Sequence, residues 1–311
     1  MTHFIKSLKR CLELSSSKFS SYSQYLYLVP AFVLTATIML TPAVYTIILS
    51  FQEWNLLTEP KWVGLSNYIK ILTRPTMVRA ILNSLTWILG TLVFGAALAL
   101  LLAQLVDSYK SKIVKGLFTI VFVAPFTFAP TTMSKIWINI FNSEGAINAT
   151  LEAIGLGAIT RSWLSLTQPL IPGLPIPIST VFLILVLCWR ILGLNYLLFL
   201  ITLESIPPYY SEAARLDGAN EWQIFWKVKF PLLKPVTLLV IAKTIINSWR
   251  MFSIPWVMTQ GGPGRATETL AVSMYRESLL LFDTGMGAAI AVFIAISSLF
   301  LSMRWLGGFT T

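Results

Sequence analysis

The charged residues with the most informative spacing lie in one short segment, Glu212-Ala-Ala-Arg-Leu-Asp-Gly-Ala-Asn220. Long apolar stretches lie on both sides of it. An amphipathic, charged element held between apolar stretches is suited to docking a partner, and Gly218 can adopt the positive φ of a sharp turn. These residue types suit the docking of a soluble protein and not bond-breaking chemistry.

Nothing else in the sequence has the spacing of a catalytic or metal site. His3 is the only histidine, and no Gly-x-x-x-x-Gly-Lys-Ser/Thr phosphate loop is present. The two cysteines, Cys11 and Cys188, lie in a polar segment and in an apolar stretch, so we expect no disulfide. The carboxylates with no visible partner are expected to be solvated in loops: Glu144, Glu152, Glu268 and Asp283. We therefore predict a chain with no enzymatic activity, metal site or cofactor of its own.

Four cations fall within the apolar stretches: Lys135, Arg190, Lys243 and Arg250. Charge at the centre of a bilayer costs at least about 2.5–3.5 kcal/mol, so such side chains usually face a cavity or extend to the interface. Arg190 and Arg250 each follow a tryptophan, with amide and hydroxyl residues nearby. Aromatic rings beside such polar groups could bind a sugar, and hydrogen bonding between helices is the alternative.

The elements that must position these residues are membrane helices. The 311 residues are 56% hydrophobic and 12% charged, which is typical of an integral membrane protein and not of a soluble one. The net charge of +10 comes mainly from short segments beside the apolar stretches. That placement follows the positive-inside rule, so we do not interpret the charge as a nucleic-acid surface.

A bilayer core of about 30 Å requires about 20 apolar residues in a helix, and six segments are long enough. We predict an all-α integral membrane protein whose spans run from residue 25 to 51, 81 to 106, 116 to 141, 178 to 203, 232 to 258 and 284 to 306. Lysines and arginines are more frequent on the side that carries the termini, which predicts a cytoplasmic location for both ends. No cleavage site precedes the first span, which we expect to be retained.

The predicted organisation is a cytoplasmic tail (1–24), a six-span domain (25–306) that contains a charged loop (204–231), and a short C-terminal tail (307–311). On the outer side we expect an interfacial loop with a short surface helix at 52–80. A second outer loop, at 141–177, should be irregular because it is rich in glycine and proline.

The 204–231 loop has its own helical pattern. Pro207-Pro208 can start a helix over 209–216, which Asp217-Gly218 would end. A second helix over 220–230 would place Trp222, Phe225 and Trp226 on one face, until Pro231 stops it. From the residues alone, a loop that docks a protein and a loop that rests on lipid headgroups are equally compatible with this pattern.

A family resemblance favours the first interpretation. Glu212-Ala213-Ala214, Gly218 and the later Pro231 resemble the EAA signature of the membrane subunits of binding-protein-dependent ABC importers. Three further short motifs resemble those of the carbohydrate-uptake permeases of the maltose and glycerol-phosphate type: Ser205-Ile-Pro, Met258-Thr-Gln-Gly-Gly-Pro263 and Asn67-Tyr68. The resemblance covers nearly the whole chain.

The resemblance implies the type I ABC importer fold with a cytoplasmic coupling helix, in a bacterial inner membrane. It also implies a second homologous permease, two ATPase subunits that carry ATP and magnesium, and a periplasmic or lipid-anchored solute-binding protein. The solute would be a sugar, a glycoside or a related polyol. The alternative is an ion- or proton-coupled secondary transporter, which would need carboxylates inside the membrane, and the predicted spans contain almost none.

The resemblance also assigns roles to residues. Glu212, Ala213, Ala214 and Gly218 would couple the chain to the ATPase. The substrate path would be lined from the two spans that flank the loop, by Trp189, Gly193 and Tyr196 on one and by Thr244, Asn247 and Ser248 on the other. We add Arg190 to this path from its position in the apolar stretch.

Overall fold

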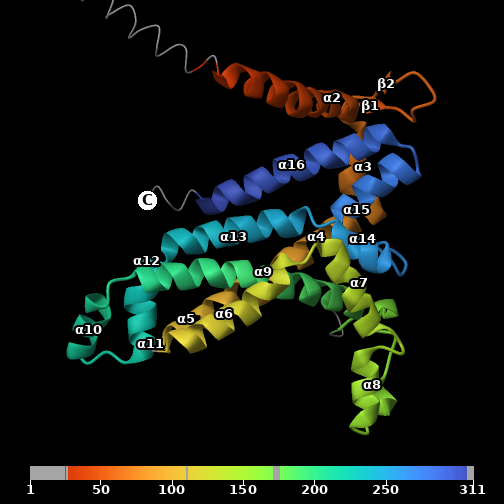
Figure 1. Ribbon diagram of the computed structural model, residues 1–311. Helices are drawn as coiled ribbons and strands as arrows, with labels where there is room; N and C mark the ends of the chain where they lie inside the picture. The colour runs from red at the N-terminus through yellow and green to blue at the C-terminus, as the bar shows by residue number, and fades with distance from the viewer. Residues whose placement is uncertain (1–24, 26, 110, 171–175, 307–311) are drawn as a thin grey trace, which may run out of the picture.

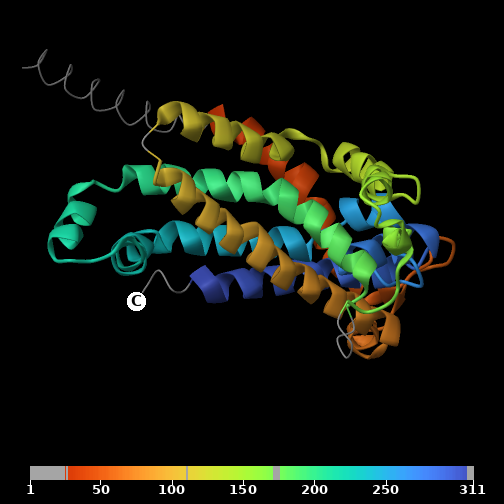
Figure 2. The same ribbon diagram turned by 90° about the horizontal axis from the view of Figure 1, so that it is seen from below.

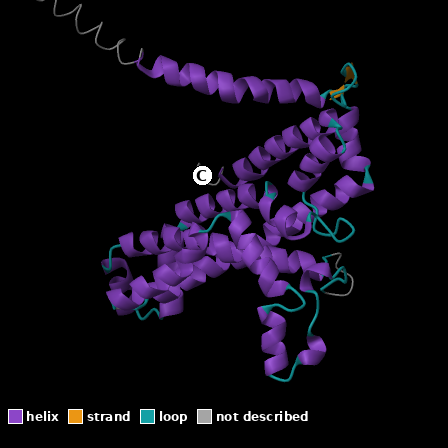
Figure 3. Cartoon of the chain, turned by 45° about the vertical axis from the view of Figure 1, so that its right-hand side comes forward, coloured by secondary structure: helices purple, strands orange, loops and turns teal. Residues whose placement is uncertain are grey.

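The protein is almost entirely helical (Figures 1 and 3). The computed structural model describes residues 25, 27–109, 111–170 and 176–306, so the two predicted tails lie outside the described residues. The described strands form one short antiparallel hairpin, in which β1 (Gln52–Glu53) pairs with β2 (Lys61–Trp62).

Prolines determine where several helices begin. Pro75 and Pro130 occupy the first turns of α4 and α7, where their missing N–H groups cost no helical hydrogen bond. The residue before each of them is extended, with ψ of 123° at Arg74 and 139° at Ala129, because the proline ring disfavours helical backbone there. The α-helices are α2 (Thr41–Ser50), α3 (Ser66–Thr73), α4 (Pro75–Thr91), α5 (Leu98–Asp107), α6 (Lys112–Thr127), α7 (Pro130–Phe141), α8 (Ala146–Ala153), α9 (Ile178–Ser205), α10 (Tyr209–Leu216), α11 (Glu221–Ile224), α12 (Phe230–Leu232), α13 (Lys234–Trp249), α14 (Ser253–Thr259), α15 (Leu270–Tyr275) and α16 (Thr284–Leu306). Short π-helical segments, η1 (Ala36–Leu40), η2 (Leu92–Ala97), η5 (Phe225–Lys229) and η6 (Arg276–Leu280), join some of them.

Four of the six predicted spans are confirmed as helices that are long and apolar enough to cross a membrane. These are Tyr27–Ser50, Pro75–Asp107, Ile178–Ser205 and Thr284–Met303. The second begins six residues earlier than the predicted start at 81, because Pro75 starts the helix within the loop that we expected to extend to residue 80.

The prediction of single helices over 116–141 and 232–258 is wrong. The chain bends by 101° between Lys112–Thr127 and Pro130–Ala153, because Pro130 excludes helical backbone at Ala129. Helix α13 ends at Trp249, and Arg250 leaves the helical conformation before α14 begins. At 1.5 Å per residue, the 16 residues of α13 extend about 24 Å.

The helices α6, α9, α13 and α16 lie side by side, and the helix formed by α4, η2 and α5 crosses them (Figure 2). The first span diverges from the bundle, and its own C-terminal end, in α2, approaches α16 (Figure 1). The 204–231 loop with α10 and α11 lies at one end of the bundle, and the hairpin, α3, α8, α14 and α15 lie at the opposite end (Figure 1). The chain therefore presents two separate polar ends.

The helices α6 and α9 approach each other closely. A Cβ atom added to Gly193 would meet the backbone of Phe122 and Val123, including the Phe122 carbonyl oxygen. Next to it, the Tyr196 side chain is fully buried, with its ring 5.1 Å from that of Phe122. Gly193 thus fixes the spacing at which α9 packs in the bundle.

We expect Gly193→Ala to lower the free energy of unfolding by about 1–3 kcal/mol, since the added methyl group has no space without a shift of α6. The matched control is Gly116→Ala on α6, where nothing lies within 4 Å of the new Cβ atom. Thermal unfolding of the purified protein in detergent measures both. Equal stability of the two variants would contradict the close packing of α6 on α9.

Candidate functional site

Helix α10 ends in a tight turn at Asp217-Gly218, where the backbone conformation favours glycine. Gly218 has a φ of +81°, the left-handed conformation that favours glycine. Its N–H donates to the Arg215 carbonyl oxygen and the Ala219 N–H to the Ala214 carbonyl oxygen, which is the Schellman pattern of a helix end. The predicted helix over 209–216 and the break after it are confirmed.

Helix α11 begins with a capping box. The Asn220 side chain accepts from the Gln223 N–H at 2.9 Å, and the Gln223 side chain accepts from the Asn220 N–H at 2.9 Å. Arg215 Nε donates to Glu221 Oε1 at 2.9 Å, and this hydrogen bond lowers the pKa of Glu221. Both side chains are exposed, so the pair orients the two short helices more than it stabilises them.

One face of α10 is directed away from the rest of the chain. Glu212 and Ala213 are exposed, Ala214 is half-buried, and Leu216 retains 90% of its side-chain exposure. Ser211, on another face of α10, is buried. An exposed leucine beside a carboxylate and two alanines gives this end of the molecule a small amphipathic surface.

The aromatic residues after the turn do share one side, as predicted. The ring centroids of Trp222 and Trp226 are 5.6 Å apart, and those of Phe225 and Trp226 are 5.0 Å apart. The prediction that Pro231 stops this helix is wrong, because Pro231 lies in the first turn of α12, where proline is tolerated, and the break follows at Leu233.

The predicted path residues on α9 mostly contact α6 and α7. Trp189 packs edge-on against Trp137, with ring centroids 5.4 Å apart, and remains partly exposed. The Arg190 guanidinium lies 5.4 Å from the centre of the Phe126 ring. Gly193 and Tyr196 are buried in the α6 contact, and the Tyr196 hydroxyl is 3.1 Å from Thr119 Oγ1.

The predicted path residues on α13 are also partly buried between helices and partly exposed. Thr244 Oγ1 accepts a hydrogen bond from Asn195 Nδ2 at 3.4 Å, and Ser248 Oγ lies 2.6 Å from Thr91 Oγ1. Both are buried between helices, whereas Asn247 is exposed. Trp189, Arg190 and Asn247 therefore keep a free surface, and the role of all seven residues in a substrate path stays a prediction.

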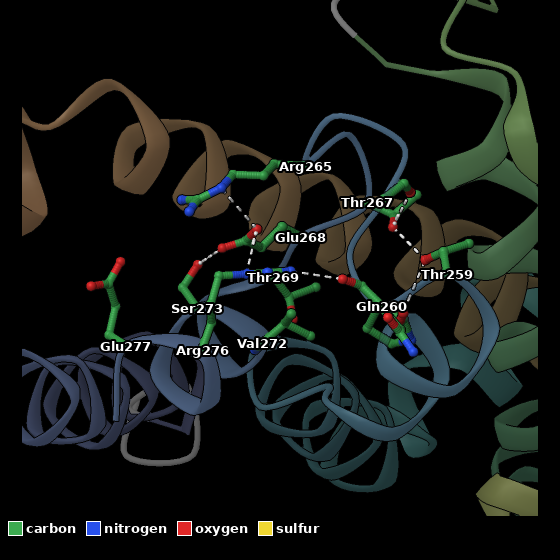
Figure 4. A network of polar contacts seen from close by, with 12 residues as sticks. Thr259, Gln260, Arg265, Thr267, Glu268, Thr269, Val272, Ser273, Arg276 and Glu277 are labelled. Atoms are coloured by element: carbon green, nitrogen blue, oxygen red, sulfur yellow. Dashed lines mark hydrogen bonds and ion pairs between the residues drawn. The ribbon is translucent and has the colours of Figure 1, made fainter. Parts of the chain in front are cut away.

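The opposite end of the molecule contains a buried carboxylate, so the expectation that Glu268 is solvated is wrong. Its side chain is only 2% exposed, and Ser273 Oγ donates to Oε1 at 2.7 Å (Figure 4). Arg265 and Arg276 form ion pairs with Oε2 at 3.6 and 3.4 Å. Arg265 precedes Glu268 by three residues, and Arg276 directly follows α15. Gln260 and Gly261 both have positive φ, and Arg276 Nη2 donates to the Gln260 carbonyl oxygen at 2.8 Å.

A second buried carboxylate lies beside this network. Glu277 is 3% exposed and pairs with Arg74 at the start of α4 at 3.3 Å. Burial raises the pKa of Glu277, and the nearby Arg74 charge opposes that shift. Asn83 adds a further contact by donating to the Ala266 and Glu268 carbonyl oxygens, each at 2.9 Å. These contacts lock the 259–277 region onto α4.

Sequence reasoning missed a group of ion pairs where the 204–231 loop joins the bundle. Asp107, at the end of α5, lies 2.7 Å from Lys229 and 3.5 Å from Lys115, and Lys115 lies 3.0 Å from Glu204. In the sequence, Lys115 and Lys229 indicated only the side of the membrane on which they lie. The available signal was Asp107, which is the only acidic residue between Glu59 and Glu144 and stands at the end of an apolar stretch.

A bundle of apolar helices with a charged two-helix loop projecting from one end defines the transmembrane subunit of a transporter. The chain belongs to the family described as binding-protein-dependent transport system inner membrane component, whose sequence pattern matches residues 92–309. It is thus a permease subunit of an ABC importer and an inner-membrane component.

Relatives agree with this assignment, and a solved structure agrees with the fold. The chain is 32% identical to the arabinooligosaccharides transport system permease protein AraP of Halalkalibacterium halodurans, over 90% of this chain and 85% of that protein. It is 28% identical to the sn-glycerol-3-phosphate transport system permease protein UgpA of Agrobacterium fabrum, over 88% and 89%. A crystal structure of a bacterial ABC transporter that imports the acidic polysaccharide alginate matches with a TM-score of 0.79 and 20% identity, over 95% of this chain and 97% of that one.

These findings confirm the predicted family and the type I importer fold. They also confirm that the chain is a transport component and not an enzyme, and they give no support to the secondary-transporter alternative.

We expect Glu268→Gln to lower the free energy of unfolding by about 1–3 kcal/mol, the cost of leaving donors unsatisfied, because two partly buried arginines would lose their counter-charge. Glu152→Gln is the control, since Glu152 is exposed in α8 and makes no ion pair among the described residues. Thermal unfolding in detergent compares them. A similar midpoint for both variants would show that the Glu268 network does not hold this region.

Proposed function

We propose that this permease imports a sugar, a glycoside or a related polyol, powered by ATPase subunits that bind its 204–231 loop. The observation that carries the proposal is the exposed face of α10, with Leu216 at 90% exposure beside Glu212 and Ala213. An apolar side chain this exposed at the end of a membrane bundle fits a protein partner, since no other part of the described chain covers it.

Each residue of this surface has a defined role in the proposal. Glu212 supplies the charge that pairs with the ATPase, and Ala213 and Ala214 let the two backbones approach closely. Gly218 sets the angle between α10 and α11 through its positive φ. ATP and magnesium bind to the ATPase subunits, and this chain transmits the movement.

The complete importer would contain this chain, a second homologous permease, two ATP-binding cassette subunits and a periplasmic or lipid-anchored solute-binding protein. The 204–231 loop and both termini face the cytoplasm in this arrangement, and the end with Glu268 faces the binding protein. Movement of α10 would open the path alternately to the two sides of the membrane.

The class of solute follows from the relatives and from the chemistry of the path. The names of AraP and UgpA describe uptake of an oligosaccharide and a polyol phosphate. Trp189 offers an aromatic face for a sugar ring, and Asn247 and Arg190 offer donors for its hydroxyl groups. These three residues are the path residues that retain free surface.

The complex reconstituted in proteoliposomes tests the function. We expect ATP hydrolysis to rise when binding protein is added with one member of a panel of arabino-oligosaccharide, sn-glycerol-3-phosphate and alginate oligosaccharide. Uptake of the labelled solute should require ATP. Uptake that persists without ATPase subunits, or ATP hydrolysis that none of these solutes changes, would contradict the proposal.

We expect Gly218→Val to leave the complex assembled in the membrane but to abolish most of the stimulated ATP hydrolysis. A left-handed backbone costs a residue with a side chain about 1–2 kcal/mol, so α10 would turn away from its position. Gly155→Val is the matched control, with the same φ of +81° and no atom within 4 Å of its Cβ position, in the loop at the opposite end. Wild-type stimulation in Gly218→Val would remove Gly218 from the coupling surface.

A further inference from the structure

Four charged side chains tie the 204–231 loop to three helices of the bundle. Lys229 Nζ lies 2.7 Å from Asp107 Oδ2, Lys115 Nζ lies 3.5 Å from Asp107 Oδ1, and Lys115 Nζ lies 3.0 Å from Glu204 Oε1. We call these residues the root cluster. Asp107 ends α5, Lys115 lies in the first turn of α6, Glu204 lies in the last turn of α9, and Lys229 ends η5.

The root cluster is shielded more than the other ion pair of the loop. The side chains of Asp107, Lys229 and Lys115 are 14%, 15% and 20% exposed, and that of Glu204 is 46% exposed. Arg215 and Glu221 are 54% and 70% exposed. Charges that are partly removed from water interact more strongly than exposed ones. Breaking such a pair by removing one partner also leaves the other uncompensated.

The cluster holds both ends of the loop. Glu204 precedes α10 in the chain, and Lys229 follows α11, so the two helices lie between the tied points. A hollow of about 520 Å³ lies between α10 and the bundle, with the root cluster and Ser211 in its lining. A force on α10 therefore reaches the bundle through the two ends of the 204–231 loop. It does not pass through direct packing of α10 on the bundle, because the hollow separates them.

We infer that Asp107 is a positioning residue for energy coupling. It holds both ends of the 204–231 loop at fixed positions relative to α5, α6 and α9. Its carboxylate binds Lys229 directly and Glu204 through Lys115. Displacement of α10 by the ATPase would then move the three helices together. The inference rests on the proposed function, because it assigns a task to Asp107 only if the loop receives the movement of an ATPase.

The experiment uses the complete reconstituted importer and compares ATP hydrolysis with and without solute-loaded binding protein, using the panel solute that stimulates the wild-type complex most. We expect Asp107→Asn to reduce the ratio of stimulated to basal hydrolysis about fivefold or more, the lower end for energetic coupling between two sites. Assembly and basal hydrolysis should be retained. Asp107→Glu should restore most of the stimulation, because it keeps the charge.

Two lysines of α6 provide a matched pair of variants. Lys115→Met should reproduce the loss seen for Asp107→Asn, whereas Lys112→Met should not. Lys112 lines the same hollow but makes no ion pair among the described residues. The double variant Asp107→Asn with Lys229→Met should lose no more than the worse single variant, since both act on one contact.

The outcomes separate the inference from the proposed function. A wild-type complex that none of the panel solutes stimulates contradicts the proposed function, and the inference is overturned with it. A stimulated wild type with equally stimulated Asp107→Asn and Lys115→Met variants overturns the inference alone. Loss of assembly in Asp107→Asn that Asp107→Glu does not rescue would show a purely structural role and also overturn it.

Discussion

The arrangement of the bundle depends on one buried amide. Asn195 Nδ2 donates to the Gly95 carbonyl oxygen at 2.8 Å and to Thr244 Oγ1 at 3.4 Å, so a single side chain in α9 joins η2 and α13. Asn195 is fully buried, where an unpaired amide N–H would be costly, although its Oδ1 has no hydrogen-bond partner among the described residues. Apolar packing between membrane helices is only weakly directional, and such a hydrogen bond therefore fixes which faces meet.

Helix α9, which contains Asn195, runs between the two polar ends of the molecule. On another side it meets the α6 backbone at Gly193, so its position is fixed from both directions. Its 28 residues begin beside the end that contains Glu268 and finish next to Glu204 in the root cluster. A helix of this length, about 42 Å at 1.5 Å per residue, is one direct mechanical connection between the two ends of the molecule, and the span Pro75–Asp107 is another.

The parts of the fold that were predicted correctly depend on local chemistry. The helix over 209–216 and its end at Gly218 follow from proline and glycine geometry alone, and four spans follow from length and apolarity. The break before Pro130 was equally local and could have been predicted from the restriction on the preceding residue. The burial of Glu268 could not, because it depends on long-range packing of this segment onto α4, where Asn83 donates to the Ala266 and Glu268 carbonyl oxygens.

The same distinction explains why the path residues were harder to assign than the loop. Helical spacing correctly places Trp189, Gly193 and Tyr196 on one side of α9, but spacing alone does not say what faces that side. In the structure that side meets α6 and α7, so a glycine and a tyrosine that suit a sugar path also suit tight packing. A surface can serve a solute only where the chain leaves it uncovered. Among the predicted path residues that condition is met at Trp189 and Asn247 and only in part at Arg190. The selectivity of the permease would then depend on how a second subunit completes the wall around these few side chains.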